Sequence, residues 1–155
     1  VVSLYYPNVV VTGRERVPRS GPVLFVANHA NSLIDPVIIG IATRRPIRFM
    51  AKAPLFDEPV LGPLMKALGM LPAYRGVDSR AQVAKNAETL AAAASQLARG
   101  EAVGIFPEGK SHDELKVDQV KTGAARMALQ AHAMGAGDLS IVPVGINYQR
   151  KEQFR

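Results

Sequence analysis

The stretch FVANHANSLIDP, residues 25–36, contains two side chains that can transfer a proton together. An imidazole such as that of His29 changes its protonation state near neutral pH, so it can remove a proton from an alcohol that attacks an acyl carbonyl. The carboxylate of Asp35, six residues later, can bond the second ring nitrogen, fix the tautomer and stabilise the imidazolium. The structural alternative is that Asp35 caps a helix and His29 lines a loop. For an isolated pair this alternative is favoured, because aspartate is a common helix N-cap.

A serine nucleophile is a second chemical possibility. Ser32 lies between the histidine and the aspartate, and Ser111 lies in the acidic stretch FPEGKSHDE at 106–114. The G-x-S-x-G turn that exposes the nucleophile of α/β-hydrolases does not occur in the sequence. The residues therefore give a serine-hydrolase site little support.

The composition limits the class of protein. The 155 residues are 48% hydrophobic, which suffices for the core of one domain spanning residues 1–155. A net charge of +6 favours anionic partners such as phosphorylated metabolites, nucleic acid or an anionic lipid surface. Without cysteine the chain has no disulfide, thiolate nucleophile or cysteine metal site, and no run of about 18 apolar residues predicts a membrane span. The terminal residues Val1 and Arg155 suggest that one or both ends were trimmed from a longer protein.

Short apolar runs alternate with amphipathic segments along the chain. Runs rich in Val, Ile and Phe and bounded by Gly or Pro predict strands at 8–13, 22–28, 46–52, 101–107 and 139–146. Apolar spacings of three and four predict helices at 36–43 with Asp35 as N-cap, 58–68, 78–99 with Asp78 as N-cap, and 120–131. Because the later strands are almost wholly apolar, we expect an α/β fold with a mostly parallel central sheet flanked by helices.

Ligands of open α/β sheets collect beyond the carboxyl ends of the strands, and the polar candidates fall there. His29 and Lys52 follow two predicted strands, and the stretch at 106–114 follows a third. Arg75 lies in the loop before the longest predicted helix. The topology therefore brings these separate segments to one edge of the sheet.

Four blocks in order resemble the glycerolipid acyltransferase family, which includes the glycerol-3-phosphate and 1-acylglycerol-3-phosphate O-acyltransferases. The blocks are NHANSLID at 28–35, GMLPAYRG at 69–76, IFPEGKSH at 105–112 and IVPVGI at 141–146. The connecting stretches AKAPLF and KTGAARMAL are also similar to that family. The resemblance implies the family's α/β fold and an acyl-transfer activity in phospholipid biosynthesis.

One feature of the first block departs from the usual family pattern. Five residues, Ala30 to Ile34, separate His29 from Asp35, where the family commonly has four. Within a helix an extra residue rotates a side chain by about 100°, so the pair can meet only if a loop absorbs the insertion. Asn31 and Ser32 are turn-forming residues in the right place for that. The five-residue spacing is similar to a branch with glycerol-3-phosphate or dihydroxyacetone-phosphate acyltransferases.

The resemblance implies roles for the matching residues. His29 is the general base, Asp35 orients it, and Arg75 binds the acceptor's phosphate, for which a guanidinium offers two parallel donors. Further substrate-binding residues implied by the blocks are Asn28, Lys52, Glu108, Gly109 and Lys110. For Glu108 two alternatives stay open, a bond to an acceptor hydroxyl or a bond that holds the loop.

Other basic side chains near these blocks can add positive charge to the same cleft. Lys110 stands where the family commonly has a small or hydroxyl residue. Lys52 and Lys121 contribute if they face the cleft, and the alternative for each lysine is a solvated surface position. Without the block around it, Arg75 would be interpreted as a surface arginine sooner than as a phosphate ligand.

The reaction implied is direct transfer from acyl-coenzyme A or acyl carrier protein, without a metal, another cofactor or a covalent acyl-enzyme. We expect membrane association at the cytoplasmic face, through PVIIGIAT and PVLGPLMKALGML if their apolar residues are exposed; the alternative is that both segments pack in the core. The flanking basic residues are Arg44, Arg45, Arg48 and Lys66. A non-catalytic phospholipid- or phosphate-binding member of the same fold is the functional alternative. Nucleic-acid binding has only the charge in its favour.

Overall fold

Five parallel strands form the centre of the molecule. The computed structural model describes residues 9–32, 34–74, 80–109 and 119–148. The strands are β1 (Val23–Ala27), β2 (Arg48–Lys52), β3 (Leu71–Ala73), β4 (Ala102–Ile105) and β5 (Ser140–Val144). Their order in the sheet is β3-β2-β4-β1-β5, and every neighbouring pair is parallel. The predicted α/β class with a parallel central sheet is confirmed.

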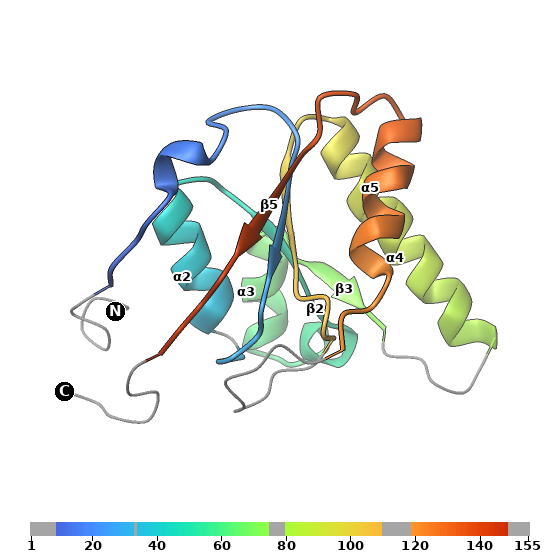
Figure 1. The fold of residues 1–155 in the computed structure, drawn as a ribbon. Coiled ribbons are helices and arrows are strands. Elements are labelled where there is room, and N and C mark those ends of the chain that lie inside the picture. The colour runs from blue at the N-terminus through green and yellow to red at the C-terminus, as the bar shows by residue number, and fades with distance from the viewer. Residues whose placement is uncertain (1–8, 33, 75–79, 110–118, 149–155) are drawn as a thin grey trace.

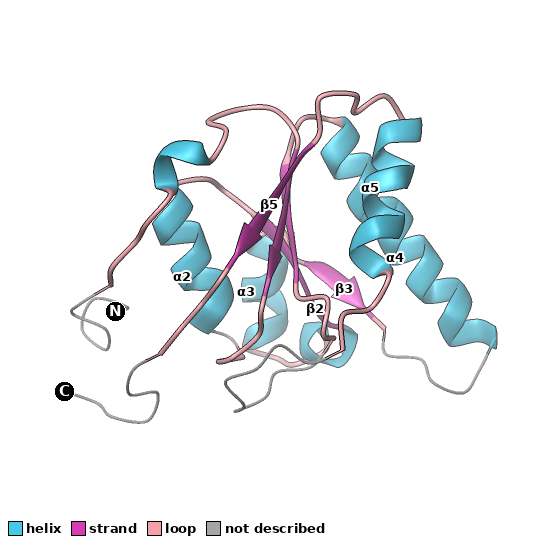
Figure 2. Ribbon diagram, viewed as in Figure 1, coloured by secondary structure: helices cyan, strands magenta, loops and turns pink. Residues whose placement is uncertain are grey.

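Helices cover the two faces of this sheet. They are α2 (Ile34–Thr43), α3 (Leu61–Ala67), α4 (Arg80–Ala98) and α5 (Gly123–Ala133), with short 3-10 turns η1 (Arg14–Arg16) and η2 (Ala53–Phe56). Figure 1 and Figure 2 show α4 and α5 side by side on one face, with α2 and α3 on the other. This three-layer arrangement explains why the strand sequences are apolar on both faces.

The core under α4 and α5 is aliphatic. Leu24 of β1 and Val103 of β4 meet Leu90 and Leu97 of α4 and Met127 of α5, all with 8% exposure or less. The leucines recur at helical spacing, so they lie on one stripe of α4. This cluster is the largest group of buried side chains among the described residues, and it fixes the helix pair to the middle of the sheet.

The opposite face carries aromatic side chains. Phe49 of β2 stacks on Phe106, which directly follows β4, with ring centroids 5.5 Å apart. The Phe49 ring lies across Gly104 of β4, its partner in the sheet register. A Cβ atom at Gly104 would lie 2.2 Å from that ring, so only glycine permits this contact. Glycine at position 104 therefore leaves room for the Phe49 ring to stack on Phe106 at the end of β4.

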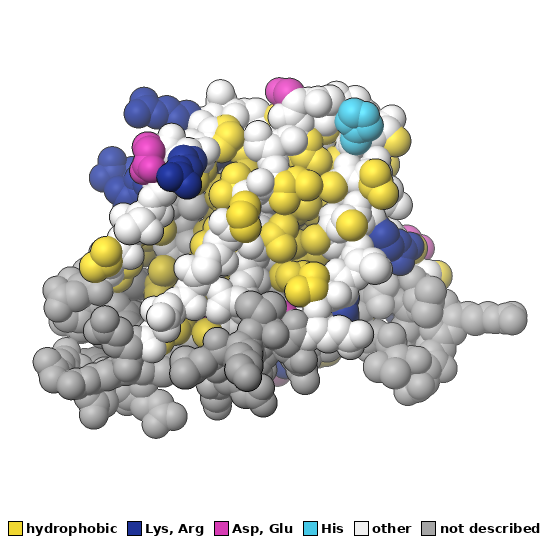
Figure 3. Space-filling model, viewed as in Figure 1, with side chains coloured by type: hydrophobic (Ala, Val, Ile, Leu, Met, Phe, Trp, Pro, Cys, Tyr) yellow, Lys and Arg dark blue, Asp and Glu magenta, His cyan; other side chains and the backbone are white. Residues whose placement is uncertain are grey.

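Both edge strands of the sheet contain a proline. Pro72 lies in β3 and Pro143 lies in β5. Proline cannot donate a ladder hydrogen bond and is found in sheets mainly at edges, so both positions fit the observed order. Ile141 of β5 is 57% exposed, and apolar side chains gather over β5 and beside α5 in Figure 3. The outermost strand on this side is therefore not covered on both faces, unlike β1 and β4.

The structure corrects several predicted elements. No strand forms over the described part of 8–13, where Val9 and Val10 are exposed and Gly13 turns the chain into η1 with a φ of 78°. An apolar run alone does not make a strand when no sheet edge receives it. β3 was not predicted from the sequence, because the strand is three residues long and contains a proline.

The helix boundaries also shift. α2 begins at Ile34, so Asp35 lies in the first turn of the helix and does not cap it as predicted. α5 begins at Gly123, and Val120 lies before it as an exposed residue. The helices predicted at 58–68 and 78–99 are present as the shorter α3 and α4. The predicted N-cap Asp78 lies outside the described residues.

Candidate active site

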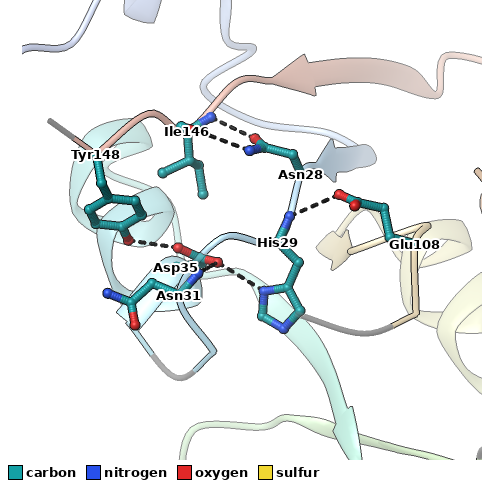
Figure 4. A network of polar contacts seen from close by, with 7 residues as sticks. All are labelled: Asn28, His29, Asn31, Asp35, Glu108, Ile146 and Tyr148. Atoms are coloured by element: carbon teal, nitrogen blue, oxygen red, sulfur yellow. Dashed lines mark hydrogen bonds and ion pairs between the residues drawn. The ribbon is translucent and has the colours of Figure 1, made fainter. Parts of the chain in front are cut away.

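His29 and Asp35 meet at the carboxyl end of β1. The Nδ1 atom of His29 lies 2.9 Å from Oδ2 of Asp35 (Figure 4). The Asp35 side chain is fully buried, and 16% of the His29 side chain is exposed. Because a carboxylate only accepts hydrogen bonds, this contact places the proton on Nδ1 and leaves the lone pair of Nε2 available. The predicted side-chain contact between His29 and Asp35 is present.

The loop between them absorbs the five-residue spacing. The carbonyl of Asn31 accepts the backbone N–H groups of Ile34 at 2.9 Å and Asp35 at 3.2 Å, which starts α2. Ser32 has a φ of 25°, a left-handed backbone value uncommon for a residue with a side chain. In addition, the N–H of Asn31 donates to Oδ2 of Asp35 at 2.7 Å. The tight turn therefore brings Asp35 back to His29, as the turn-forming residues predicted.

Glu108 connects the third sequence block to the histidine loop. Its Oε1 atom accepts the backbone N–H of His29 at 3.0 Å, and its side chain is 1% exposed. A buried carboxylate is stable only when it is hydrogen-bonded, and here the donor is the backbone of His29 itself. The geometry therefore matches the loop-holding alternative for this residue.

An aromatic ring supports the imidazole from one side. Phe106 stacks on His29 with ring centroids 4.0 Å apart and an interplanar angle of 12°. Because Phe106 also stacks on Phe49, the histidine ring is the outer member of a row of three rings that begins in the core. Phe106 was not predicted as a site residue, because a phenylalanine at a strand end is usually an ordinary core residue.

Two further contacts come from the segment after β5. Asn28 donates from Nδ2 to the carbonyl of Ile146 at 2.9 Å and accepts the N–H of Ile146 on Oδ1 at 2.7 Å. The hydroxyl of Tyr148 donates to Oδ1 of Asp35 at 2.6 Å. Figure 4 shows this segment lying beside the histidine loop. Tyr148 was not predicted as a site residue, although it also follows a strand at the carboxyl edge of the sheet.

Two further predicted site residues, Gly109 and Lys52, follow strands at the same edge. Gly109 has a φ of 73°, and its N–H donates to the carbonyl of Phe106 at 3.0 Å, which closes the turn after β4. A Cβ atom at Gly109 would lie 2.9 Å from Nζ of Lys121, so this lysine reaches over the turn. Lys52 is exposed at the end of β2, with β4 lying between β2 and β1.

Other predicted residues have no described position. Arg75, Lys110 and Ser111 lie outside the described residues, so their proposed roles rest on the sequence. Within the described ranges, no group of three or more His, Asp or Glu side chains is arranged to hold a metal ion.

Comparison with known proteins gives a consistent family. The model of the family described as Acyltransferase matches residues 8–147. The chain is 28% identical to the chloroplastic 1-acyl-sn-glycerol-3-phosphate acyltransferase of Arabidopsis thaliana, over 93% of this chain and 40% of that protein. It is 29% identical to glycerol-3-phosphate O-acyltransferase 2 of Saccharomyces cerevisiae, over 99% of this chain and 22% of that protein.

A solved structure shares the fold. The crystal structure of the 1-acyl-sn-glycerophosphate acyltransferase of Thermotoga maritima superposes with a TM-score of 0.62 at 25% identity, and the match covers 80% of this chain and 46% of that one. The chain therefore spans less than half of the length of each of these three proteins.

Proposed function

Because this chain belongs to the acyltransferase family, we propose that it transfers an acyl group from a thioester to a hydroxyl of a glycerol-phosphate acceptor, with His29 as general base. The observation that carries the proposal is the 2.9 Å contact between Nδ1 of His29 and the buried Asp35 carboxylate. The activities named for the relatives, 1-acyl-sn-glycerol-3-phosphate and glycerol-3-phosphate acyltransferase, support the substrate class.

The proton transfer follows from the tautomer. The acceptor hydroxyl gives its proton to Nε2 of His29 as its oxygen attacks the thioester carbonyl. The carbon–sulfur bond of the tetrahedral intermediate then breaks, and the imidazolium returns the proton to the leaving thiolate. Asp35 stabilises the positive charge that His29 carries between the two steps. The acyl group moves directly from donor to acceptor, so no residue of the chain forms an ester.

Residues around the dyad divide into support and substrate binding. Glu108 holds the histidine loop, because its carboxylate accepts the backbone N–H of His29. Asn28 joins this loop to the segment after β5, because its side-chain amide is hydrogen-bonded to the backbone of Ile146. Gly109 lets the acceptor approach the turn after β4, beside the ammonium group of Lys121. We assign the acceptor's phosphate to Arg75, with positive charge added by nearby lysines.

Cationic candidates for that charge are Lys52, Lys110 and Lys121. The donor is acyl-coenzyme A or acyl carrier protein, both of them anionic, which suits the net charge of +6. The acceptors to test are glycerol-3-phosphate, dihydroxyacetone phosphate and 1-acylglycerol-3-phosphate. The five-residue spacing between His29 and Asp35 favours the first two.

A membrane surface is the proposed place of the reaction. None of the helices in the described ranges has the length and apolar character to cross a bilayer. Val37 and Ile41 of α2 and Leu64 of α3 are between 43% and 55% exposed, so apolar side chains are available for an interfacial contact. Two of the four basic residues expected to meet lipid headgroups have protein partners instead.

The basic residues with protein partners are Arg45 and Arg48. Arg45 donates to the carbonyls of Pro18 and Gly21, and Arg48 pairs with Glu101. The hydrogen bond that Arg48 donates to Glu101 raises the pKa of Arg48, and burial lowers the pKa of Arg45. Arg44 and Lys66 are exposed and are therefore the better candidates for headgroup contacts.

The first experiment measures acyl transfer from acyl-coenzyme A to each of the three acceptors. We expect His29→Ala to lower kcat by about 10²- to 10⁴-fold, the usual contribution of a positioned general base. His132→Ala is the matched control, since His132 lies exposed in the last turn of α5. Equal activity of His29→Ala and His132→Ala would rule out the general-base assignment.

The same assay tests the alternative and the phosphate site. A non-catalytic binding protein would bind vesicles that contain lysophosphatidate but would transfer no acyl group to any of the acceptors. Arg75→Ala is expected to raise mainly the KM for the phosphorylated acceptor. An effect confined to the acyl donor would move the phosphate site away from Arg75.

A further inference from the structure

The carboxylate of Asp35 is held at both of its oxygen atoms. Oδ2 accepts the Nδ1–H of His29 at 2.9 Å and the N–H of Asn31 at 2.7 Å. Oδ1 accepts the hydroxyl of Tyr148 at 2.6 Å. Because terminal torsions of aspartate side chains are soft, a carboxylate bonded at one oxygen can still turn, and the bond at Oδ1 removes this freedom.

We propose that Tyr148 is a positioning residue for proton transfer, which acts by locking the carboxylate of Asp35 and thereby the tautomer of His29. This role rests on the proposed function of His29 as a base. In this scheme Tyr148 acts on the reaction through Asp35. Its hydroxyl–carboxylate contact, at 2.6 Å, has the short length of a hydrogen bond to a charged acceptor.

The backbone places Tyr148 through the sheet. β1 and β5 run in parallel register up to the pair Ala27 and Val144. Beyond that pair, the side-chain amide of Asn28 continues the ladder by bonding both backbone groups of Ile146. Two residues later, Tyr148 points back to Asp35, as Figure 4 shows. The two bonds of Asn28 thus hold the segment that carries the tyrosine at a fixed distance from the histidine loop.

The burial of Asp35 indicates how loss of the Tyr148 hydroxyl would affect His29. Asp35 is fully buried, so solvent cannot replace a donor that is removed from Oδ1. Loss of the Tyr148 hydroxyl leaves the carboxylate of Asp35 free to turn. The hydrogen bonds that Oδ2 accepts from His29 and Asn31 are then less well aligned. The consequence for the imidazole is a smaller share of molecules with the proton on Nδ1, and therefore fewer with a basic Nε2.

The test removes one oxygen atom with Tyr148→Phe. Long-range nitrogen–proton correlation spectra of neutral histidine side chains report which ring nitrogen of His29 carries the proton. We expect Nδ1–H as the main form in the unaltered protein and a loss of this preference in Tyr148→Phe and in Asp35→Asn. The control Thr43→Val deletes a hydroxyl that donates to the carbonyl of Ile39 at the far end of α2, and should leave the tautomer unchanged.

Kinetics give the second readout. A hydrogen bond to a charged group typically changes an equilibrium by about tenfold or more, so we expect kcat of Tyr148→Phe to fall about tenfold with little change in either KM. In the Asp35→Asn background the same change should cost less than about twofold, because the two residues act as one unit. Equal losses in both backgrounds would overturn the proposal, as would an unchanged tautomer in Tyr148→Phe.

The two readouts separate this proposal from the proposed function. If no acceptor is acylated by the unaltered protein, the proposed function fails, while the tautomer of His29 still tests whether Tyr148 orients Asp35. If transfer occurs and depends on His29 but Tyr148→Phe retains both full kcat and the original tautomer, only the role of Tyr148 is rejected.

Discussion

The two faces of the sheet hold different kinds of buried side chains. On the α4 and α5 face, Leu24, Leu97 and Met127 form a purely aliphatic cluster with no exposure to solvent. On the other face, Phe49 and Phe106 form a stacked row that ends on His29. The aliphatic cluster includes none of the polar residues of the site, whereas the aromatic row is in direct contact with His29. The difference indicates that the first face supplies mainly stability and the second also holds the site in place.

The largest effect on stability is expected on the aliphatic face. Leu97→Ala removes a fully buried side chain, and we expect the free energy of unfolding to fall by about 2–5 kcal/mol. Urea denaturation measures this loss. Leu129→Ala on α5, whose side chain is 71% exposed, is the control and should stay within about 0.5 kcal/mol of the unaltered protein. Under conditions where Leu97→Ala is folded, its kcat should be unchanged, and a large drop would erase the distinction between the faces.

A smaller loss of stability with a larger loss of activity is expected between the strands. Gly104→Ala places a methyl group where the Phe49 ring lies, which forces a shift of that ring and costs about 1–3 kcal/mol. Since Phe49 supports Phe106, we also expect a lower kcat, measured at a temperature well below the unfolding midpoint. Restored stability without restored kcat in the double variant Gly104→Ala with Phe49→Leu would confirm the clash with the ring as the cause of the instability.

The smallest change in stability is expected at the aromatic ring next to the histidine. Phe106→Leu keeps an apolar side chain but removes the stacking, for which aromatic pairs contribute about 0.5–1.5 kcal/mol. We expect kcat to fall by up to about tenfold because the imidazole loses its support, since about 1.4 kcal/mol corresponds to a tenfold change in rate. If Leu97→Ala lowered kcat more than Phe106→Leu did, the aromatic row would have no special relation to the site.

Much of the fold could be predicted from the sequence because its core strands have strong local patterns. The runs that became β1, β2, β4 and β5 are apolar and bounded by glycine or proline, so period and boundaries agree. β3 has no such pattern; Pro72 is acceptable there only because the strand lies at an edge of the sheet, which is a tertiary fact. Conversely, Val9 and Val10 have strand-like side chains but pair with none of the strands in the described ranges.

The site was predictable where one block contains both partners. His29 and Asp35 are close in the chain, and the turn residues Asn31 and Ser32 indicated how they meet. Glu108 was identified, but whether it bonds a ligand or the loop depended on a contact across 79 positions of sequence. Tyr148 was missed for the same reason, since its contact with Asp35 spans 113 positions and no local pattern reports it.

The two hydrogen bonds between Asn28 and Ile146 have a consequence for the order of folding. They join residues 118 positions apart, and β5 is synthesised after the other four described strands. Closing so long a loop is entropically costly and contributes nothing until the sheet that holds its ends exists. During synthesis, the histidine loop therefore emerges early but acquires its final supports late. A nascent chain that has already formed β1 and β4 still lacks the contacts of Asn28 and Asp35 with the segment after β5. The contacts around His29 and Asp35 are therefore complete only after most of the hydrophobic core has formed.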